Sequence, residues 1–377
     1  MREELLVVAG EASGDLHGAR LVSELRRLIP DLHVFGLGGD ELRAAGLDPV
    51  AHSAEISVVG ITEVLKILSR ARQIFAELLR QVDLRRPRAA VLIDFPDFNL
   101  RLARELKRRG VRVLYYISPQ VWAWRKERVR TIAQVVDRML VLFPFEVDFY
   151  RRFGVEVTHV GHPLVDEVPQ LPNVWDAGDS EEEPFRLALL PGSRRSEIEA
   201  LLPTLLDAVR LLAGRLPVQA SLIQAPTVPR ELLEERVELS GLPLRIVSED
   251  RFTVIADSHL ALCASGTATL EVGLLGTPMV VLYRLGLWTW MLARLLVRLP
   301  YYSLVNLVLE QAVVPELLQW QATPERIADE AERLLTGEGE RARLRAGLAE
   351  LRGKLGEAGA SARAAREVAG LLGQGGT

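Results

Sequence analysis

Cysteine and long apolar runs are the scarce features of this 377-residue sequence. Its one cysteine, Cys263, excludes a disulfide framework and a multi-cysteine metal site. No apolar run reaches the roughly 18 residues that a membrane-spanning helix needs. Residues 1–4 are charged and lead straight into a predicted strand, so we expect no signal peptide and a cytoplasmic protein.

The composition is that of a folded protein. Hydrophobic residues make up 49% and charged residues 25%, which excludes disorder and fibrous repeats. The length favours two domains. The net charge is −4, but the charged side chains are distributed unevenly along the chain. Residues 66–130 contain 17 basic and 6 acidic side chains. This local surplus predicts either an ordinary solvated face or a surface for an anionic partner.

Short apolar runs alternate with longer amphipathic segments along the whole chain. The predicted strands are 5–9, 33–36, 89–93, 111–117, 138–143, 157–160, 186–190, 219–224, 244–247, 259–263 and 279–283. Among the predicted helices are 19–28, 62–82 and 100–109, and residues 324–373 favour helix only. The alternation indicates the α/β class, with two Rossmann-like, doubly wound parallel-sheet domains facing a cleft.

Domain boundaries follow from a change in composition. Residues 167–184 contain three prolines and an acidic run, which is typical of a linker. We therefore expect an N-terminal domain at 1–166, a linker at 167–184 and a second domain at 185–340. Helices at 341–377 are expected to pack back toward the first domain.

Ligands of open parallel sheets bind beyond the carboxyl ends of the strands, so the turns there are the candidate sites. The first turn has two features that suit an anionic or hydroxyl-rich ligand, close-approach glycines and the start of a helix. It matches neither a dinucleotide fingerprint nor a Walker loop. The alternative is a tight turn capped by Ser13 or Asp15. The candidates here are Gly10, Glu11, Ser13, Gly14 and Asp15.

The turn after 89–93 carries two aspartates. Asp94 closes a buried strand, where partial burial raises a carboxyl pKa toward the range of a useful base. Asp97 precedes a predicted helix and is equally explained as its N-cap.

Two turns of the second half suit a diphosphate. Gly192 and Ser193 offer backbone N–H groups and Arg194 a bidentate donor, although a capping box from Ser193 or Ser196 to Glu197 or Glu199 explains the same residues. The second turn opens a helix with small and hydroxylated residues, and Glu271 lies one helical turn beyond Thr267, where it can accept from ribose hydroxyls. This turn contributes Ser265, Gly266, Thr267, Ala268, Thr269 and Glu271.

These turns, together with the string Ser-Pro-Gln-Val-Trp-Ala-Trp-Arg at 118–125, resemble the lipid-A-disaccharide synthases. That family consists of inverting glycosyltransferases of the GT-B fold, and the resemblance extends from about residue 5 to 370. It implies a hexosyl transfer from UDP-2,3-diacylglucosamine to 2,3-diacylglucosamine 1-phosphate. The products would be the β-1,6-linked lipid A disaccharide 1-phosphate and UDP. It further implies no metal and no cofactor, no nucleic-acid partner, and in some members a homodimer with exchanged C-terminal elements.

The resemblance also assigns roles to single residues. Asp94 matches the essential aspartate, with Glu11 and Asp97 as further catalytic candidates. The acceptor side would comprise Gly10, Ser13, Gly14, Asp15, Gln120 and Trp122. Asn306 matches an asparagine near the nucleotide, although Val305 stands where the family usually has proline.

Acylated substrates would explain the basic stretch. Apolar residues exceed the needs of one helix face at Val64, Leu65, Ile67 and Leu68, and Lys66, Arg70 and Arg72 lie among them. This pattern suits a helix at an anionic membrane surface, and the protein is then expected at the inner face of the cytoplasmic membrane. An ordinary amphipathic helix on the sheet is the alternative. Residues 285–299, with two tryptophans and two arginines, are a second membrane candidate.

Two other functions fit the same pattern. A UDP-sugar 2-epimerase would use the same fold without a lipid acceptor, so UDP release in the presence of acceptor distinguishes the two enzymes. A non-enzymatic nucleotide-sugar-binding protein is disfavoured by the presence of Asp94, Arg194 and Glu271.

Overall fold

The computed structural model describes residues 3–56, 64–122, 128–176, 184–286, 290 and 299–373, without the side chains of 64–67. The chain divides into two compact units, residues 1–163 with 356–377 and residues 164–355. Residues 177–183 of the expected linker lie outside the described part. So does most of the second membrane candidate, 285–299. Across the described residues, we find no helix with the length and apolar character required to cross a bilayer.

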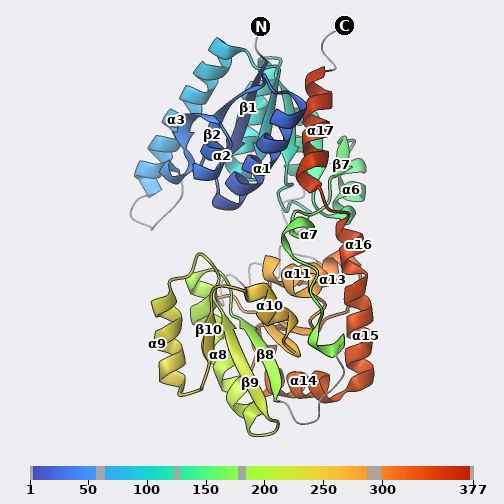
Figure 1. Ribbon diagram of the computed structural model, residues 1–377. Helices are drawn as coiled ribbons and strands as arrows, with labels where there is room; N and C mark the ends of the chain where they lie inside the picture. Colours follow the sequence, from blue (N-terminus) through green and yellow to red (C-terminus); the bar gives the residue numbers. More distant parts are fainter. Residues whose placement is uncertain are drawn as a thin grey trace. The chain divides into compact units, whose positions relative to one another are not determined.

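The first unit is built on a seven-stranded parallel sheet with the order β3-β2-β1-β4-β5-β6-β7 (Figure 1). Its central strands are buried on both faces and rich in Val, Leu and Ile, as parallel sheets covered by helices require. The strands are β1 (Glu4–Ala9), β2 (His33–Gly38), β3 (Asp48–His52), β4 (Ala89–Ile93), β5 (Arg112–Tyr116), β6 (Arg138–Val141) and β7 (Val157–His159).

Helices cover both faces of this sheet. The last helix of the chain belongs to this unit and packs along α1 (Figure 1). Two side-chain contacts fasten it: Arg138 pairs with Glu367, and Arg363 donates to the carbonyl of Val160. The helices are α1 (Ala12–Leu28), α2 (Asp40–Ala44), α3 (Val64–Arg85), α4 (Pro96–Arg108), α5 (Arg128–Val135), α6 (Pro144–Arg151) and α17 (Ala360–Gly373).

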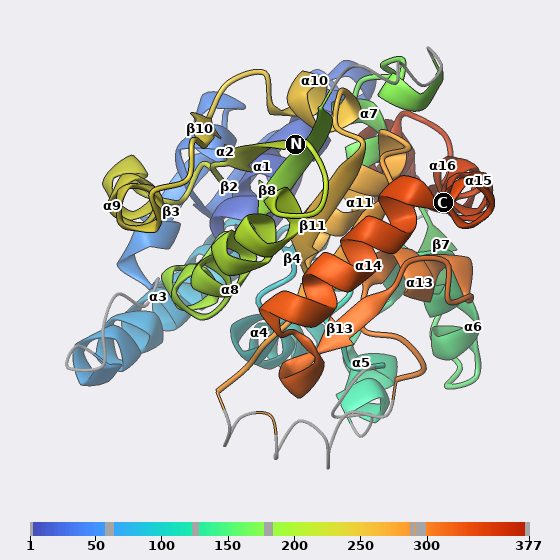
Figure 2. The same cartoon turned by 90° about the horizontal axis from the view of Figure 1, so that it is seen from below.

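The second unit repeats the arrangement with six parallel strands in the order β10-β9-β8-β11-β12-β13. Helices α8 and α14 lie side by side on one face of this sheet (Figure 2). Its strands are β8 (Phe185–Leu190), β9 (Val218–Ile223), β10 (Arg245–Val247), β11 (Leu260–Ala264), β12 (Met279–Tyr283) and β13 (Glu316–Leu318). Its helices are α7 (Leu164–Glu167), α8 (Arg195–Ala213), α9 (Arg230–Ser240), α10 (Arg251–Ala256), α11 (Thr267–Leu274), α13 (Leu304–Leu309), α14 (Pro324–Thr336), α15 (Glu338–Ala349) and α16 (Leu351–Leu355).

The predicted fold class is confirmed, because each unit has the doubly wound order of a Rossmann-like sheet. Two short strands, β3 and β13, were not predicted. Helices α1 and α4 begin at Ala12 and Pro96, seven and four residues before the predicted starts at residues 19 and 100. Apolar periodicity locates the buried part of a helix, and the exposed first turn of each helix lies outside that pattern.

The strand order fixes where a ligand can bind. In the first sheet β1 lies beside β4, and in the second β8 lies beside β11. At each of these pairs the connections leave toward opposite sides, so a crevice opens at the carboxyl ends of the two strands. The four turns singled out in the sequence, Gly10–Asp15, Asp94–Asp97, Gly192–Arg194 and Ser265–Thr269, follow these four strands.

Candidate active site

The packing of a neighbouring side chain explains the glycine at position 10. A Cβ atom at Gly10 would lie 2.4 Å from the ring of Phe95, in the turn after β4. The absence of a side chain therefore lets the turn after β4 pack against the end of β1. This contact brings Glu11 and Asp94 to the same edge of the sheet.

Asp94 and Phe95 both adopt left-handed backbone conformations, with φ of 43° and 50°. Such conformations cost a non-glycine residue about 1–3 kcal/mol each and persist only where neighbours hold them. Two buried side chains hold the Asp94 carbonyl: Tyr115 Oη donates to it at 2.5 Å and Asn99 Nδ2 at 2.7 Å. Sequence reasoning missed both residues, although Asn99 stands in the same motif as Asp94. Their convergence depends on β5 lying beside β4.

The electrostatic setting of Asp94 suits a proton acceptor. Burial, together with the smaller effect of the negative charge of Glu11, raises the pKa of the Asp94 carboxyl to about 6. This agrees with the direction expected from the sequence. A carboxylate with a pKa near 6 is largely ionised at pH 7, and it is a stronger proton acceptor than an ordinary carboxylate.

Asp97 has a different environment. It lies in the first turn of α4, whose N-cap is Phe95, so the expected N-cap role of Asp97 is wrong. Its side chain is 74% exposed and forms an ion pair with Arg128 at 2.5 Å. The two aspartates therefore have different environments: Asp94 lies partly buried at the end of β4, and Asp97 forms an ion pair at the surface.

Asp15 also has a structural explanation. Its buried carboxylate accepts backbone N–H groups from Gly39 at 2.6 Å, Glu41 at 3.0 Å and Leu42 at 3.2 Å. It thus caps α2, whereas the sequence suggested a cap for its own helix, in which Glu11 is the N-cap without a side-chain bond. Of the other acceptor-side candidates in this turn, Ser13 is exposed and Gly14 is buried.

The segment after β5 is anchored by a buried carboxyl group. Trp122 Nε1 donates to Glu146 Oε1 at 3.1 Å, and the amide of Phe143 donates to Glu146 Oε2 at 3.1 Å. Burial raises the pKa of Glu146 to about 7. The indole nitrogen of Trp122 is therefore engaged within the fold, whereas Gln120 is exposed. Residues 123–125 of the motif at 118–125 lie outside the described part.

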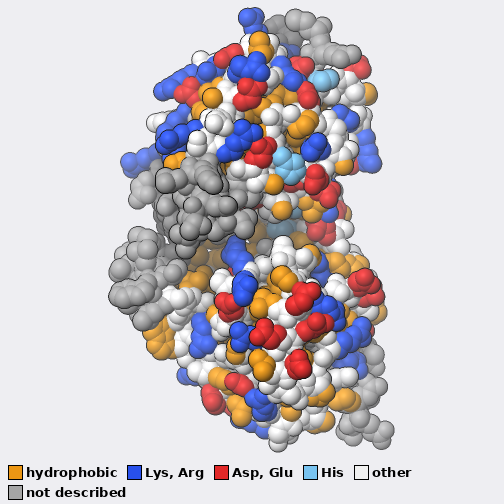
Figure 3. Space-filling model, turned by 90° about the vertical axis from the view of Figure 1, so that its left-hand side faces the viewer, with side chains coloured by type: hydrophobic (Ala, Val, Ile, Leu, Met, Phe, Trp, Pro, Cys, Tyr) orange, Lys and Arg blue, Asp and Glu red, His pale blue; other side chains and the backbone are white. Residues whose placement is uncertain are grey.

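The expected membrane helix corresponds to the start of α3. Leu68 is 43% exposed, and the side chains of Val64, Leu65 and Ile67 lie outside the described part. Figure 3 shows many Lys and Arg side chains on the first unit, with acidic and apolar side chains among them. Arg70 pairs with Glu55, so the basic surplus of this region is partly neutralised.

A cavity of about 330 Å³ opens at the switch point of the second unit, and we call it the donor pocket. The predicted nucleotide-binding residues line it, except for Asn306 and for Thr269, which is buried. Sequence reasoning missed Gln224 and Arg251, which follow β9 and β10 and line the same cavity. The residues from the predicted set are Gly192, Ser193, Arg194, Ser265, Gly266, Thr267, Ala268 and Glu271.

Glu197 occupies the backbone donors at one end of this pocket. Its Oε2 accepts the amides of Ser193 at 3.0 Å and Arg194 at 3.3 Å, and its Oε1 lies 3.1 Å from Arg194 Nη1. A Cβ at Gly192 would lie 2.6 Å from this carboxylate. Glu197 is thus the acidic partner of the expected capping arrangement, but the N-cap is Arg194 and neither serine serves as the cap.

The opposite wall is formed by α11 and its surroundings. Ser265 Oγ donates to the carbonyl of Tyr302 at 2.9 Å, and Thr269 Oγ1 to that of Gly266 at 2.7 Å, so both hydroxyls have partners within the fold. Burial raises the pKa of Glu271, and Arg251 opposes that shift through an ion pair at 3.3 Å. Arg251 therefore favours the ionised form of Glu271, which is the form suited to accept hydrogen bonds from ribose hydroxyls.

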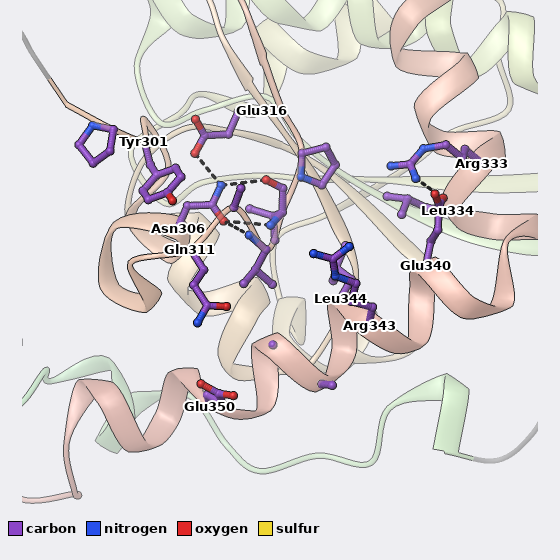
Figure 4. Close-up of a pocket in the computed structure, with 17 residues that line it drawn as sticks. Tyr301, Asn306, Gln311, Glu316, Arg333, Leu334, Glu340, Arg343, Leu344 and Glu350 are labelled. Carbon is purple, nitrogen blue, oxygen red and sulfur yellow. Dashed lines mark hydrogen bonds and ion pairs between the residues drawn. The ribbon is translucent and has the colours of Figure 1, made fainter.

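Asn306 does not line the donor pocket. Its Oδ1 accepts the amides of Val313 and Val314 at 2.9 Å, and its Nδ2 donates to Val314 O and Glu316 Oε1 at 2.8 Å (Figure 4). These bonds hold the chain between α13 and β13 beside a separate cavity of about 620 Å³. The side chain is thus fully hydrogen-bonded within the fold, which explains an asparagine here without a nucleotide.

Comparison with known proteins gives one consistent family. A family model described as Lipid-A-disaccharide synthetase matches residues 5–367. A lipid-A-disaccharide synthase of Myxococcus xanthus is 48% identical over 374 residues, covering 98% of this chain and 97% of the relative. One of Solibacter usitatus is 44% identical over 381 residues, with coverage of 98% and 97%.

Solved structures are similar at the level of the fold. MurG of Acinetobacter baumannii has a TM-score of 0.61 at 14% identity and 99% coverage of both chains. The calicheamicin glycosyltransferase CalG4 has a TM-score of 0.59 at 18% identity and 100% coverage of both. A UDP-GlcNAc 2-epimerase of Neisseria meningitidis has a TM-score of 0.57 at 10% identity, covering 98% of this chain and 99% of its own. These likenesses confirm the expected GT-B architecture.

We expect Asp94→Asn to raise stability at neutral pH. The folded pKa of about 6 exceeds the ordinary 3.8, so the native state binds more protons than the unfolded state between these values. Wild-type stability therefore falls as pH rises through that window, by roughly 1–3 kcal/mol in all. An asparagine carries no such cost and tolerates the left-handed backbone.

Thermal unfolding at pH 4 and pH 7.5 measures this effect. The Tm difference between Asp94→Asn and wild type should grow in favour of the variant at the higher pH. Asp97→Asn, at an exposed ion pair worth about 0–1 kcal/mol, is the matched control and should show no gain. A clear loss of Tm for Asp94→Asn at pH 7.5 would contradict the assigned cost.

Proposed function

The chain belongs to the lipid-A-disaccharide synthase family, and we propose that it joins UDP-2,3-diacylglucosamine to 2,3-diacylglucosamine 1-phosphate with inversion at the anomeric carbon. Its relatives at 44–48% identity share that name over nearly the whole chain, whereas the 2-epimerase likeness at 10% identity concerns the fold alone. A hexosyltransferase of lipid A synthesis is therefore favoured over an epimerase. The observation that carries the mechanism is the half-buried Asp94 with a pKa near 6.

In the proposed reaction Asp94 takes the proton from the 6-hydroxyl of the acceptor. The acceptor oxygen then forms a bond to the anomeric carbon of the donor, while the bond from that carbon to the UDP oxygen breaks. Attack and departure on opposite faces give inversion, as in inverting glycosidases, with a sugar hydroxyl in place of water. Asp97 is not favoured as the base, because it is exposed and paired with Arg128.

The leaving UDP needs positive charge and directed hydrogen-bond donors. Arg194 and the amino-terminal end of α11 line the donor pocket and are proposed to receive the diphosphate without a metal ion. Glu271 is proposed to accept the ribose hydroxyls, with Arg251 holding its carboxylate. The reaction thus draws its base from the first unit and its leaving-group site from the second.

Incubation with both substrates, followed by mass spectrometry, tests the activity. We expect a disaccharide 1-phosphate and an equal amount of UDP. Asp94→Asn should lower the rate by about 10²–10⁴-fold, as expected for loss of a general base, while Asp97→Asn should stay within a few-fold of wild type. UDP formed at the same rate without acceptor, or an active Asp94→Asn, would contradict the proposal.

The pH profile tests the influence of Glu11. For wild type, kcat/KM for the acceptor should fall as pH drops through about 6, because Asp94 becomes protonated. Glu11→Gln removes a negative charge that raises this pKa, so the acidic limb should move to lower pH. Glu24→Gln, farther along the same helix, is the control and should leave the limb in place. An unmoved limb in Glu11→Gln would show that Glu11 does not tune the base.

We further propose that the start of α3 contacts an anionic membrane, since both proposed substrates carry acyl chains. Leu68, with Arg70 and Arg72 nearby, is exposed there. The protein should float with vesicles containing phosphatidylglycerol and release at high salt, and Leu68→Ser should weaken this binding. Ser69→Ala at the adjacent exposed position is the control. Equal flotation of the Leu68 variant and wild type would move the contact elsewhere.

A further inference from the structure

The donor pocket extends beyond the residues proposed for phosphate and ribose. Sheet order places β9 and β10 on the far side of β8 from β11, and Gln224, Ala225, Pro226 and Arg251 line the pocket there. Arg251 also contacts Glu271, the proposed ribose acceptor. For a nucleoside diphosphate with its phosphates at α11 and its ribose at Glu271, Gln224 remains as a candidate contact for the base.

The Gln224 amide is held in one orientation. Its backbone N–H donates to Val247 O at 2.8 Å, which ties the end of β9 to β10. Its Nε2 donates to Val228 O at 2.7 Å, so Oε1 is the remaining end of the amide. Among the residues that the structure describes, buried Oε1 has no hydrogen-bond partner. A buried acceptor left unpaired carries an energetic penalty, which a hydrogen-bond donor on a ligand removes.

Arg251 supplies the complementary group. Its Nη2 is engaged with Glu271, and its guanidinium lies 4.6 Å from the ring centre of Phe252. Its Nε is buried and, within the described ranges, has no hydrogen-bond partner either. Gln224 and Arg251, which both line the donor pocket, thus carry one unpaired acceptor and one unpaired donor. Unsatisfied buried polar groups in a native fold call for an explanation, and a polar ligand is one.

We propose that Gln224 and Arg251 select the base of the nucleotide, an inference that rests on the UDP-sugar donor proposed above. Gln224 Oε1 accepts the N3–H of uracil, and Arg251 Nε donates to an adjacent carbonyl oxygen of the same ring. Uracil presents a donor at N3 flanked by two carbonyl acceptors. Cytosine in the same position presents a lone pair at N3, which opposes the lone pairs of Gln224 Oε1.

Calorimetric titration of the full chain with UDP, CDP and inorganic pyrophosphate tests this assignment. Wild type should bind UDP more tightly than CDP. Gln224→Met, which keeps the size and removes the acceptor, should weaken UDP binding by about 3–10-fold, the effect of one hydrogen bond. CDP and pyrophosphate binding should change little, so the preference for UDP should largely disappear. Gln224 is the cleaner position for substitution, because Arg251 also holds Glu271.

Gln219→Met, at an exposed position of β9, is the matched control and should bind all three ligands as wild type does. Gln224→Ala provides the same comparison if the methionine variant does not fold. An unchanged ratio of UDP to CDP affinity in the Gln224 variants, or an equal loss of pyrophosphate binding, would overturn the assignment and leave the proposed transferase intact. Wild type that binds no UDP would overturn both.

Discussion

The neighbouring strand pairs β1–β4 and β8–β11 set the position of everything else that bears on function. In each sheet the connections from these two strands leave toward opposite faces, so their carboxyl ends are not covered by a crossing helix. Backbone groups and short side chains there are free to face a ligand. The fold thus provides one such edge in each unit, and residues with reactive or anion-binding chemistry stand at both.

The two edges use different physical means. At the first, the chain accepts a cost: a partly buried carboxyl group and two left-handed residues, held by Tyr115 and Asn99. The same burial that destabilises ionised Asp94 gives it the pKa of about 6 that a base requires. At the second, small residues and helix starts line a cavity, and the buried Glu271 is balanced by Arg251. In the proposed mechanism, the strained and partly buried edge supplies the base for proton transfer, and the open lining of the second edge binds the nucleotide.

Sequence reasoning located the edges well, because apolar strands and the polar turns after them are local signals. It identified Asp94, and the donor-pocket residues Gly192–Arg194 and Ser265–Ala268, from such turns. It failed where a residue's partner is remote in the chain. Asp15, for example, caps a helix that starts 25 positions later. Tyr115, Gln224 and Arg251 were missed for the same reason, since only strand order brings them to the site.

Glu197 weakens the binding that would be expected from the hydrogen-bond donors at the proposed diphosphate site of the donor pocket. Its carboxylate already accepts the Ser193 and Arg194 amides and contacts the Arg194 guanidinium. A diphosphate bound to these groups would displace the Glu197 carboxylate from them. The net gain in binding free energy is therefore smaller than it would be if these donors were unpaired. At the base end, Gln224 Oε1 and Arg251 Nε have no competing partner in the described part of the fold. A hydrogen bond formed there replaces no existing bond within the protein, and this asymmetry supports the proposal that the selective contacts of the donor are made to its base.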